Sequence, residues 1–459
     1  MFTTTLLCIL GLAAFGYLAA RLRARRLAAA GGVRLHSLPG YHGAFVALWV
    51  GIPSIVLVLI WVVLQGPVID RLILDSMPDA LTADVGSGRQ QLLVSEVKSV
   101  AAGRIFTEPS AAVLAAADRY NQWQGLARWA MFAAALTVAL LALVWARARL
   151  APAFRARHGV ERILNGVMIV CSLIAILTTL GIVLSLLFEA LRFFDRVPWY
   201  EFFFGLNWEP QMPIREDQVA GLGAFGAVPV FTGTLLAAAL AMLVAVPVGL
   251  LSAVYMAEYA TARFRATVKP VLEILAGIPT VVYGFFAVLT VAPALRQFGA
   301  ALGLDIAPNS AFAAGAVMGI MLIPFVSSLS DDALAAVPWA MREGAYGLGA
   351  TKAETVVSVL LPAALPGIVG GILLALSRAI GETMIVVMAA GLIATLTANP
   401  FEAVTTVTVQ IVTLLIGDTE FDSPKTLAAF ALGLVLFAIT LALNVIALRV
   451  VQKYREKYD

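Results

Sequence analysis

Residues 331–366 read DDALAAVPWAMREGAYGLGATKAETVVSVLLPAALP, and they separate two apolar runs at 311–330 and 367–391. The stretch is rich in helix-forming residues, but it also contains residues that favour helix starts, interruptions and ends: Pro338, Gly347, Gly349, Pro362 and Pro366. We expect the first proline to begin a helix, the glycines to interrupt it, and the last two prolines to end the segment. The pattern predicts a short helical loop between two membrane-spanning helices.

The composition around this loop is that of a membrane protein. The chain is 61% hydrophobic and 13% charged, which is more apolar and less charged than an average soluble domain. A helix needs about 20 apolar residues to cross the hydrocarbon, where no water satisfies the backbone. The sequence offers nine such runs: 2–20, 43–65, 126–145, 163–188, 229–257, 268–295, 311–330, 367–391 and 425–449. We therefore predict an all-α membrane protein with about nine transmembrane helices.

The basic residues predict the orientation of these spans, because cytoplasmic loops carry the excess of Lys and Arg. With residue 1 outside, the basic clusters fall on the cytoplasmic side: 21–34, 147–162, 263–269 and 449–457. The segment 392–424, on the other side, contains no Lys or Arg. Arginines follow the first span rather than precede it, so we expect an uncleaved anchor with its N-terminus outside. Nine crossings then place the C-terminus in the cytoplasm.

The spans fall into two predicted blocks. Residues 1–160 contain three spans and an external segment at 66–125, whereas residues 161–459 contain six spans with short connections. An arginine-rich linker, 147–162, divides the two blocks. The external segment is too short for a separate solute-binding domain.

Several functional classes find no support in the sequence. The net charge of +3 is too small to indicate a nucleic-acid partner. The two cysteines, Cys8 and Cys171, lie within apolar runs and form neither a disulfide framework nor a metal site. His36, His42 and His158 stand beside basic loops without a catalytic constellation, so we expect them at the membrane interface. We predict no metal and no enzyme activity in this chain.

Two charged residues, Arg378 and Glu382, interrupt the apolar run 367–391 near its centre. An arginine at that depth costs about 2.5–3.5 kcal/mol on insertion, so it normally faces the protein interior or a water-filled path. In a continuous helix the spacing of four residues places both side chains on one face. We therefore expect the pair to mark a functional site.

The loop 331–366 resembles the ATPase-coupling loop of ABC-importer permeases, whose pattern is E-A-A-x3-G-x9-I-x-L-P. Six positions of this pattern fall on Glu343, Gly344, Ala345, Gly349, Leu361 and Pro362. Gly344 and Val359 depart from the pattern, and both replacements conserve size. The resemblance implies that these residues and Arg342 transmit the movement of a separate ATPase to the membrane helices. The alternative is an amphipathic helix that lies on the inner leaflet.

A second resemblance is to C-type permeases of bacterial phosphate (Pst) ABC importers. Residues 378–384 read RAIGETM and are similar to the R-A-[LI]-G-E-T-M stretch of that family, and residues 276–284 also match. The likeness covers about 161–459, while residues 1–160 look like the extension of longer members. It implies a type I importer core of six helices in the bacterial inner membrane. It also implies a second permease subunit, two ATPase subunits that bind ATP-Mg, and an external phosphate-binding protein.

Under this resemblance, five residues are expected along the substrate pathway: Arg378, Glu382, Thr383, Gly277 and Pro279. A guanidinium offers a planar fork to phosphate oxygens, and a carboxylate accepts the proton that phosphate carries and sulfate lacks. The alternative is a buried salt bridge between Arg378 and Glu382 that holds or gates helices without touching substrate. Gly277 and Pro279 are expected to interrupt their span, as helices beside transport pathways often do.

Other transport mechanisms remain open at this point. The cargo could be another oxyanion, such as sulfate or molybdate, or the chain could be an ion-coupled secondary transporter, which would need no ATPase-docking loop. None of the six lysines follows a glycine, so the chain lacks a phosphate-cradling P-loop. If the importer interpretation holds, ATP is hydrolysed on another chain, and this subunit carries no cofactor.

Overall fold

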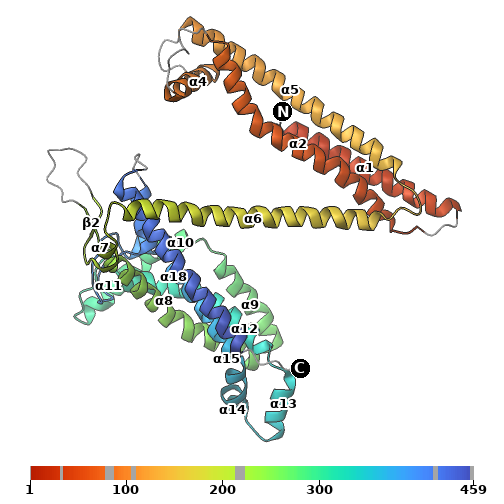
Figure 1. Cartoon of the computed structure of the whole chain (residues 1–459). Helices are drawn as coiled ribbons and strands as arrows, with labels where there is room; N and C mark the ends of the chain where they lie inside the picture. Colours follow the sequence, from red (N-terminus) through yellow and green to blue (C-terminus); the bar gives the residue numbers. More distant parts are fainter. Residues whose placement is uncertain are drawn as a thin grey trace. The chain divides into compact units, whose positions relative to one another are not determined.

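The computed structural model describes residues 2–31, 35–77, 87–104, 110–211, 223–416 and 422–454. These parts of the chain are almost entirely helical (Figure 1). Their contacts divide the molecule into two units, Met1–Leu177 and Thr178–Asp459. The boundary falls within the long helix α6 (Ala156–Phe194), whereas the sequence suggested a division near the start of that helix.

Within these described ranges, nine helices are long and apolar enough to cross a membrane, as predicted. Each overlaps one predicted run: Phe2–Ala28, Pro39–Asp75, Ala111–Ala148, Ala156–Phe194, Val228–Tyr259, Thr280–Ala301, Ala311–Ala335, Lys352–Ile380 and Pro424–Lys453. Several helices extend beyond the apolar run that predicted them, because polar ends can stay helical outside the hydrocarbon.

The first unit is built on an antiparallel helical bundle. Besides the beginning of α6, it contains α1 (Phe2–Gly31), α2 (Pro39–Asp75), α4 (Ser87–Ala101) and α5 (Ala111–Ala148). Ala20, Val46 and Ala139 are fully buried where α1, α2 and α5 meet. A Cβ atom at Gly43 would lie 2.8 Å from the Tyr17 side chain, so α1 and α2 approach closely at this point.

The predicted external segment 66–125 is partly helical rather than a separate loop region. Helix α2 continues into it, α5 begins inside it, and α4 packs against both. Lys98 of α4 forms a salt bridge of 2.8 Å with Asp70 of α2. Residues 78–86 and 105–109 of this segment lie outside the described residues.

The three histidines, which are expected at the membrane interface, differ in how far the protein covers them. His36 and His158 are exposed, and their rings lie 5.9 Å apart. His42, in the first turn of α2, is only 1% exposed and packs near Phe154. Cys8 and Cys171 are both exposed free thiols.

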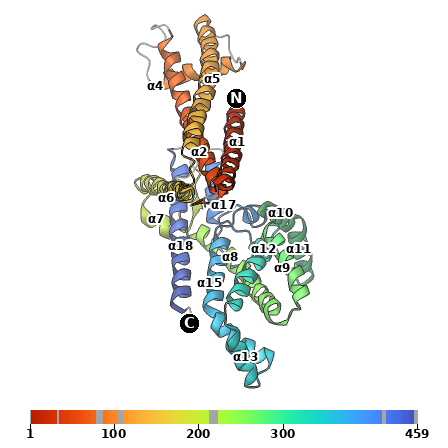
Figure 2. The same ribbon diagram turned by 90° about the vertical axis from the view of Figure 1, so that its right-hand side faces the viewer.

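The second unit is centred on three helices: α8 (Val228–Val254), α12 (Ala311–Ala335) and α15 (Leu361–Ile380). Figure 2 shows α12 beside both α8 and α15. Small residues allow this close packing. A Cβ atom at Gly315 would lie 2.6 Å from Leu240, and one at Gly319 would lie 2.7 Å from Val244. In a bilayer, where the hydrophobic effect does not hold helices together, such close contact is what stabilises their association.

The predicted sixth span, 268–295, is not one helix. The chain instead forms α9 (Ala262–Ala276), then α10 (Thr280–Phe286), the π-helical turn η2 (Ala287–Val291) and α11 (Ala292–Ala301). Helix α9 buries no side chain completely and lies outside the spanning segments. The break at 277–279 moves the start of the span to Thr280, because Pro279 provides the extended residue before α10.

The remaining elements connect or flank this core. They are α7 (Trp199–Phe204), β1 (Trp208–Glu209), β2 (Ala224–Phe225), η1 (Tyr255–Tyr259), α13 (Trp339–Gly347), α14 (Lys352–Thr355), η3 (Val356–Leu360), α16 (Met384–Ala389), α17 (Val407–Leu415) and α18 (Pro424–Tyr454). β1 and β2 pair in antiparallel fashion, with Trp208 opposite Phe225. Helix α18 packs against α15 and α17.

Candidate functional site

The predicted transmembrane run 367–391 is broken in the middle. Helix α15 ends at Ile380, Gly381 caps it, and the short helix α16 begins at Met384. The expectation that Arg378 and Glu382 share one face of a continuous helix is therefore wrong. The chain leaves the helix at Gly381, whose φ of −85° and ψ of −2° are ordinary right-handed values, and helical structure resumes only at Met384.

Glu382 lies in this break, and its carboxylate caps the start of α16. Its side chain is 8% exposed. The Oε1 atom accepts hydrogen bonds from the backbone N–H groups of Met384 (3.1 Å) and Ile385 (3.4 Å). Oε2 forms no hydrogen bond within the described part of the chain. One carboxylate oxygen is thus held in place while the other remains able to accept a proton-bearing ligand.

Arg378 lies in the last turn of α15 and is exposed on the surface of this chain. It forms no salt bridge with Glu382 or with any other carboxylate among the described residues. The structure therefore contradicts the alternative in which these two residues form a buried ion pair. A cation in the last turn also interacts favourably with the helix dipole.

Thr383 contributes to the same break, and the structure adds a residue that the sequence had not indicated. The Thr383 hydroxyl donates to the Gly381 carbonyl at 3.4 Å. From α17, the Thr408 hydroxyl donates to the Glu382 carbonyl at 2.9 Å. The only signal in the sequence is a threonine-rich stretch, TTVT at 405–408. Thr408 therefore ties the break to a segment more than twenty residues further along the chain.

A buried amide holds the extended segment between α16 and α17. Gln410 accepts a hydrogen bond from the Trp208 indole at 2.9 Å. Its own amide donates to the Leu392 carbonyl at 2.9 Å and to Thr405 Oγ1 at 3.1 Å. Sequence reasoning missed this network, because its members are separated by up to 202 positions.

The predicted interruption at Gly277 and Pro279 is present, and it lies near the first break. Gly277 caps α9, and Pro279 precedes α10. The Tyr283 hydroxyl donates across the interruption to the Leu275 carbonyl at 2.9 Å. Helix α10 then packs against α16, where a Cβ atom at Gly284 would lie 2.6 Å from the Met388 sulfur. The two broken spans thus meet through α10 and α16.

The loop that follows α12 presents a helix and a sharp turn. Glu343 and Gly344 are exposed on α13, and Ala345 is partly buried. Gly349 adopts a φ of +88°, a conformation that L-residues rarely adopt, and it turns the chain after α13. Leu348, beside it, is 92% exposed, a prominent apolar side chain that the motif did not indicate. The predicted loop is shorter than expected, since residues 331–335 still belong to α12.

Leu361 and Pro362 lie at the start of α15, where Pro362 occupies the first turn. The expectation that Pro362 and Pro366 stop the chain is wrong, because α14, η3 and α15 form one continuous helical run from Lys352. Pro362 directly follows the π-helical turn η3 (Val356–Leu360), where the regular hydrogen-bond pattern is already interrupted, so the run can accommodate a residue without a backbone N–H. Pro366 lies inside α15, six residues after the end of the π-helical turn η3.

Arg342 faces inward rather than toward a partner. Its side chain is 6% exposed and pairs with Glu258 of η1 over 3.1 Å between Nε and Oε1. Its Nη1 and Nη2 atoms donate to the carbonyls of Val337 (2.8 Å) and Leu334 (3.0 Å) at the end of α12. The guanidinium also lies over the Trp339 ring. The resemblance implied that Arg342 takes part in ATPase coupling, and the structure shows it inside the permease, where it holds α13 against α12 and η1.

No group of three or more potential metal ligands occurs among the residues that the structure describes. Chemically, the site offers a fixed carboxylate, an unpaired guanidinium and threonine hydroxyls at a break between helices. A guanidinium and hydroxyls are groups that hydrogen-bond anions, and the described residues of this set include no nucleophile with an adjacent base.

Comparisons with known proteins place this arrangement in a family. Residues 245–456 match the binding-protein-dependent transport system inner membrane component family, and residues 6–178 match a family described as phosphate ATP-binding cassette transporter. The phosphate transport system permease protein PstC 1 of Mycobacterium tuberculosis is 34% identical over 283 residues, which cover 56% of this chain and 83% of the relative. The chain belongs to the PstC family of ABC transporter permeases.

Two further similar proteins are a second permease sequence and a solved transporter structure. The probable ABC transporter permease protein YqgH of Bacillus subtilis is 34% identical over 280 residues, 60% of this chain and 86% of the relative. A solved bacterial alginate ABC transporter, in complex with an alginate-bound periplasmic protein, is 17% identical with a TM-score of 0.45 and covers 65% of this chain and 96% of its own. The resemblance noted from residues 378–384 is confirmed at the level of the family.

Proposed function

We propose that this PstC-family permease moves inorganic phosphate into the cell by alternating access, with no covalent chemistry of its own. It acts beside a second permease subunit and two ATPase subunits, and it receives phosphate from an external binding protein. The N-terminus lies outside and the C-terminus in the cytoplasm of the bacterial inner membrane. Relatives named as phosphate permeases over most of their length support the cargo.

The observation that carries the proposal is the helix break at Glu382. Half-helix ends and unwound backbone inside a membrane are tolerated where they line a cavity or pathway. Here the break places a carboxylate with one unbonded oxygen four positions along the chain from Arg378, whose guanidinium has no ion pair in the described part of the chain. Both groups are therefore available to a ligand.

This pair favours a protonated oxyanion. The Arg378 guanidinium donates two parallel hydrogen bonds to phosphate oxygens. The Glu382 carboxylate accepts a hydrogen bond from the P–OH group that phosphate still carries near neutral pH. A fully deprotonated oxyanion such as sulfate has no such donor, so the carboxylate only repels it. Thr383, at the same break, donates its hydroxyl proton to the Gly381 carbonyl over a long 3.4 Å, and it would turn from that carbonyl to donate to a third oxygen. Discrimination against sulfate thus comes from a repulsive element as well as an attractive one.

Gly277 and Pro279 take part as a flexible joint beside this site. The interruption separates α9 from α10, and α10 packs against α16, which Glu382 caps. A change in the angle between α9 and α10 therefore moves the wall of the Glu382 break. Hinge movements of this kind concentrate at the ends of elements.

The loop between α12 and α15 receives the driving force. Glu343, Gly344 and Ala345 form the presented part of α13, and Leu348 is the apolar tip. The ATPase subunits, which hold ATP-Mg, bind this tip. Leu361 and Pro362, at the start of α15, transmit its movement to that helix. Membrane lipid covers the apolar outer faces.

Phosphate uptake by cells that depend on this importer tests the proposal. Arg378→Gln and Glu382→Gln are each expected to abolish most uptake of labelled phosphate, while Arg263→Gln, which removes an exposed cation without a side-chain partner, leaves uptake unchanged. Excess sulfate or molybdate is expected not to compete. Wild-type rates in both variants, or full competition by sulfate, would refute the assigned roles.

Purification provides a second, independent test. A tagged wild-type chain is expected to bring an ATPase subunit and a second permease through detergent extraction, and Leu348→Glu is expected to lose the ATPase but keep the permease. Recovery of the chain alone, with uptake that does not depend on ATP, would instead indicate a secondary transporter.

A further inference from the structure

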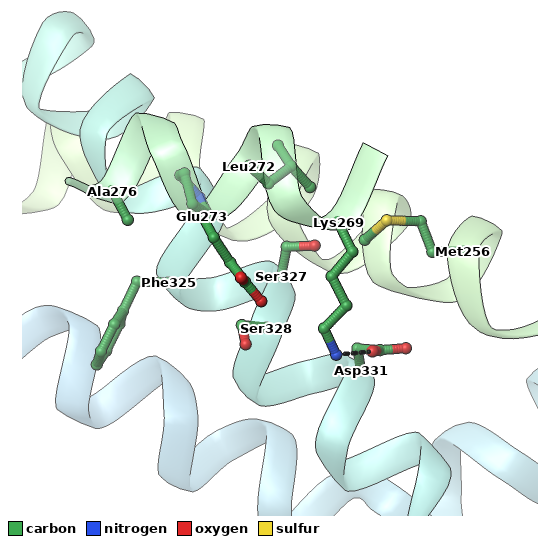
Figure 3. A pocket seen from close by; sticks show the side chains of 10 residues that line it. Met256, Lys269, Leu272, Glu273, Ala276, Phe325, Ser327, Ser328 and Asp331 are labelled. Atoms are coloured by element: carbon green, nitrogen blue, oxygen red, sulfur yellow. Dashed lines mark hydrogen bonds and ion pairs between the residues drawn. The ribbon is translucent and has the colours of Figure 1, made fainter. Parts of the chain in front are cut away.

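A cavity of about 220 Å³ lies between α9 and α12, away from the Glu382 break. Figure 3 shows that Lys269 and Glu273 of α9 point toward Ser327, Ser328 and Asp331 of α12. The volume is far more than the roughly 10–15 Å³ that one water molecule needs. The cavity is therefore large enough for a small hydrated ion.

Several polar groups of this cavity have no hydrogen-bond partner among the residues that the structure describes. Ser327 is completely buried, and its hydroxyl forms no hydrogen bond. Ser328 and Glu273 also form no side-chain hydrogen bond among the described residues. An unpaired buried hydroxyl costs about 1–3 kcal/mol, so its retention beside a cavity indicates a ligand that pairs with it.

Lys269 brings positive charge to the same space. Its ammonium donates to Asp331 Oδ2 at 2.9 Å, and Arg265 donates to both oxygens of that carboxylate at 2.9 Å. The hydrogen bond to Asp331 raises the pKa of Lys269 above its usual value, so the side chain is charged at neutral pH. Two cations thus surround the buried carboxylate of Asp331, and Lys269 also lies 3.9 Å from the exposed carboxylate of Asp332. The ammonium has three N–H groups, so it can still donate to a further acceptor.

The cavity and the Glu382 break lie at different heights along helices α12 and α15. Cβ atoms at Gly367 and Gly371 of α15 would touch Ala333 and Leu329 of α12, so these helices run antiparallel with residues 327–331 beside about 369–373. Arg378 lies seven residues beyond Gly371, about 10 Å further from the coupling loop. The cavity is therefore the site nearer to the cytoplasmic end.

We propose that this cavity is a second phosphate subsite, which holds the ion on its way from the Glu382 break to the cytoplasm. The inference rests on the proposed function. Lys269, Ser327 and Ser328 donate to phosphate oxygens, and Glu273 accepts the proton of the ion. A cation and a carboxylate four residues apart, Lys269 and Glu273, repeat on α9 the chemistry that Arg378 and Glu382 provide at the break.

Phosphate binding to the purified importer in lipid nanodiscs, without binding protein or nucleotide, tests this site. The Glu382→Gln variant disables the first site, and we expect it to retain binding of labelled phosphate by equilibrium dialysis. Adding Ser327→Ala is expected to weaken the remaining affinity by about tenfold, since a hydrogen bond to a charged group is lost. Adding Arg263→Gln, on the same helix but outside the cavity, is expected to have no effect.

If Ser327 had only a structural role, Ser327→Ala would lower the melting temperature and leave phosphate affinity unchanged. The subsite predicts the reverse. Because its hydroxyl is unpaired, Ser327→Ala is expected to leave the melting temperature unchanged or slightly higher. Glu273→Gln replaces an acceptor with a group that also donates, so sulfate is expected to compete for the remaining site about tenfold better than in the parent. Neither substitution is expected to affect recovery of the complex.

The outcomes separate this inference from the proposed function. Loss of all binding in Glu382→Gln, or unchanged binding when Ser327→Ala is added, overturns the second subsite even if the wild-type importer transports phosphate. Absence of ATP-driven phosphate uptake by the wild-type importer overturns the proposed function itself. If the cavity holds only water, adding Ser327→Ala leaves phosphate binding unchanged, and the second subsite is overturned.

Discussion

Replacement of Arg342 by methionine tests the finding that this residue acts inside the permease. Methionine keeps a long apolar stem but removes the charge and all three hydrogen bonds of the guanidinium. Glu258 then remains as an unpaired buried carboxylate, and the carbonyls of Leu334 and Val337 lose their donor. We expect α13 to detach from η1 and the end of α12.

The size of the effect follows from burial. The side chains of Arg342 and Glu258 are only 6% and 7% exposed, so solvent screens their interaction little. Removing one member of a buried ion pair costs about 3–5 kcal/mol, because the other charge is left without a partner. For a unit of this size, that corresponds to a fall in melting temperature on the order of 5–10 °C.

The measurement is thermal unfolding of the purified importer, together with recovery of the ATPase subunit. Glu343→Gln is the control for the melting temperature only, because Glu343 is exposed on the same helix but belongs to the surface proposed to bind the ATPase; the melting temperature is expected to be unchanged. The double variant Arg342→Met with Glu258→Gln is expected to recover part of the loss, because no charge is left buried. Equal melting temperatures for Arg342→Met and Glu343→Gln would refute the internal role.

Three further predictions concern the backbone and the packing. Gly349→Ala is expected to destabilise the turn by about 1–2 kcal/mol, because its φ is +88°, and to lower recovery of the ATPase subunit with the tagged chain. Gly344→Ala lies on a helix with open space at Cβ, and it is expected to leave that recovery unchanged or slightly higher. Gly319→Ala places a Cβ atom 2.8 Å from the Ala241 carbonyl, so a cost of about 1–3 kcal/mol should appear as a lower melting temperature. Thr408→Val removes the 2.9 Å hydrogen bond to the Glu382 backbone and is expected to lower phosphate uptake severalfold without lowering the amount of chain in the membrane.

The sequence predicted the number and approximate place of the spans, because hydropathy reports directly on what the bilayer demands of the backbone. It failed where a span contains a break. Residues 268–276 are apolar enough to extend the predicted sixth run, yet they form α9, which lies before the interruption at Gly277. Composition does not distinguish an amphipathic helix on the surface from the first turns of a spanning helix.

The candidate site was found by residue type but not by geometry. Arg378 and Glu382 were singled out because charges are rare at mid-membrane. Their relation changed because Gly381 ends α15, and a spacing of four residues has meaning only within one helix. Local sequence gives no indication that α16 begins again at Met384, with Glu382 as its cap.

Contacts over long separations were beyond sequence reasoning. Arg342 stands next to the coupling motif and was grouped with it, but its partner Glu258 lies 84 positions earlier. The same holds for Asp331, which pairs with Arg265 and Lys269 over more than sixty positions. Only the fold shows which exposed-looking charges are used internally.

ATP-driven accumulation of labelled phosphate in proteoliposomes tests the central claim most directly. With the binding protein outside and ATP-Mg inside, the complete importer is expected to concentrate phosphate, and Glu382→Gln is expected to abolish this while leaving assembly intact. Accumulation that continues without ATP, or that is the same for Glu382→Gln as for the wild-type chain, would contradict the account.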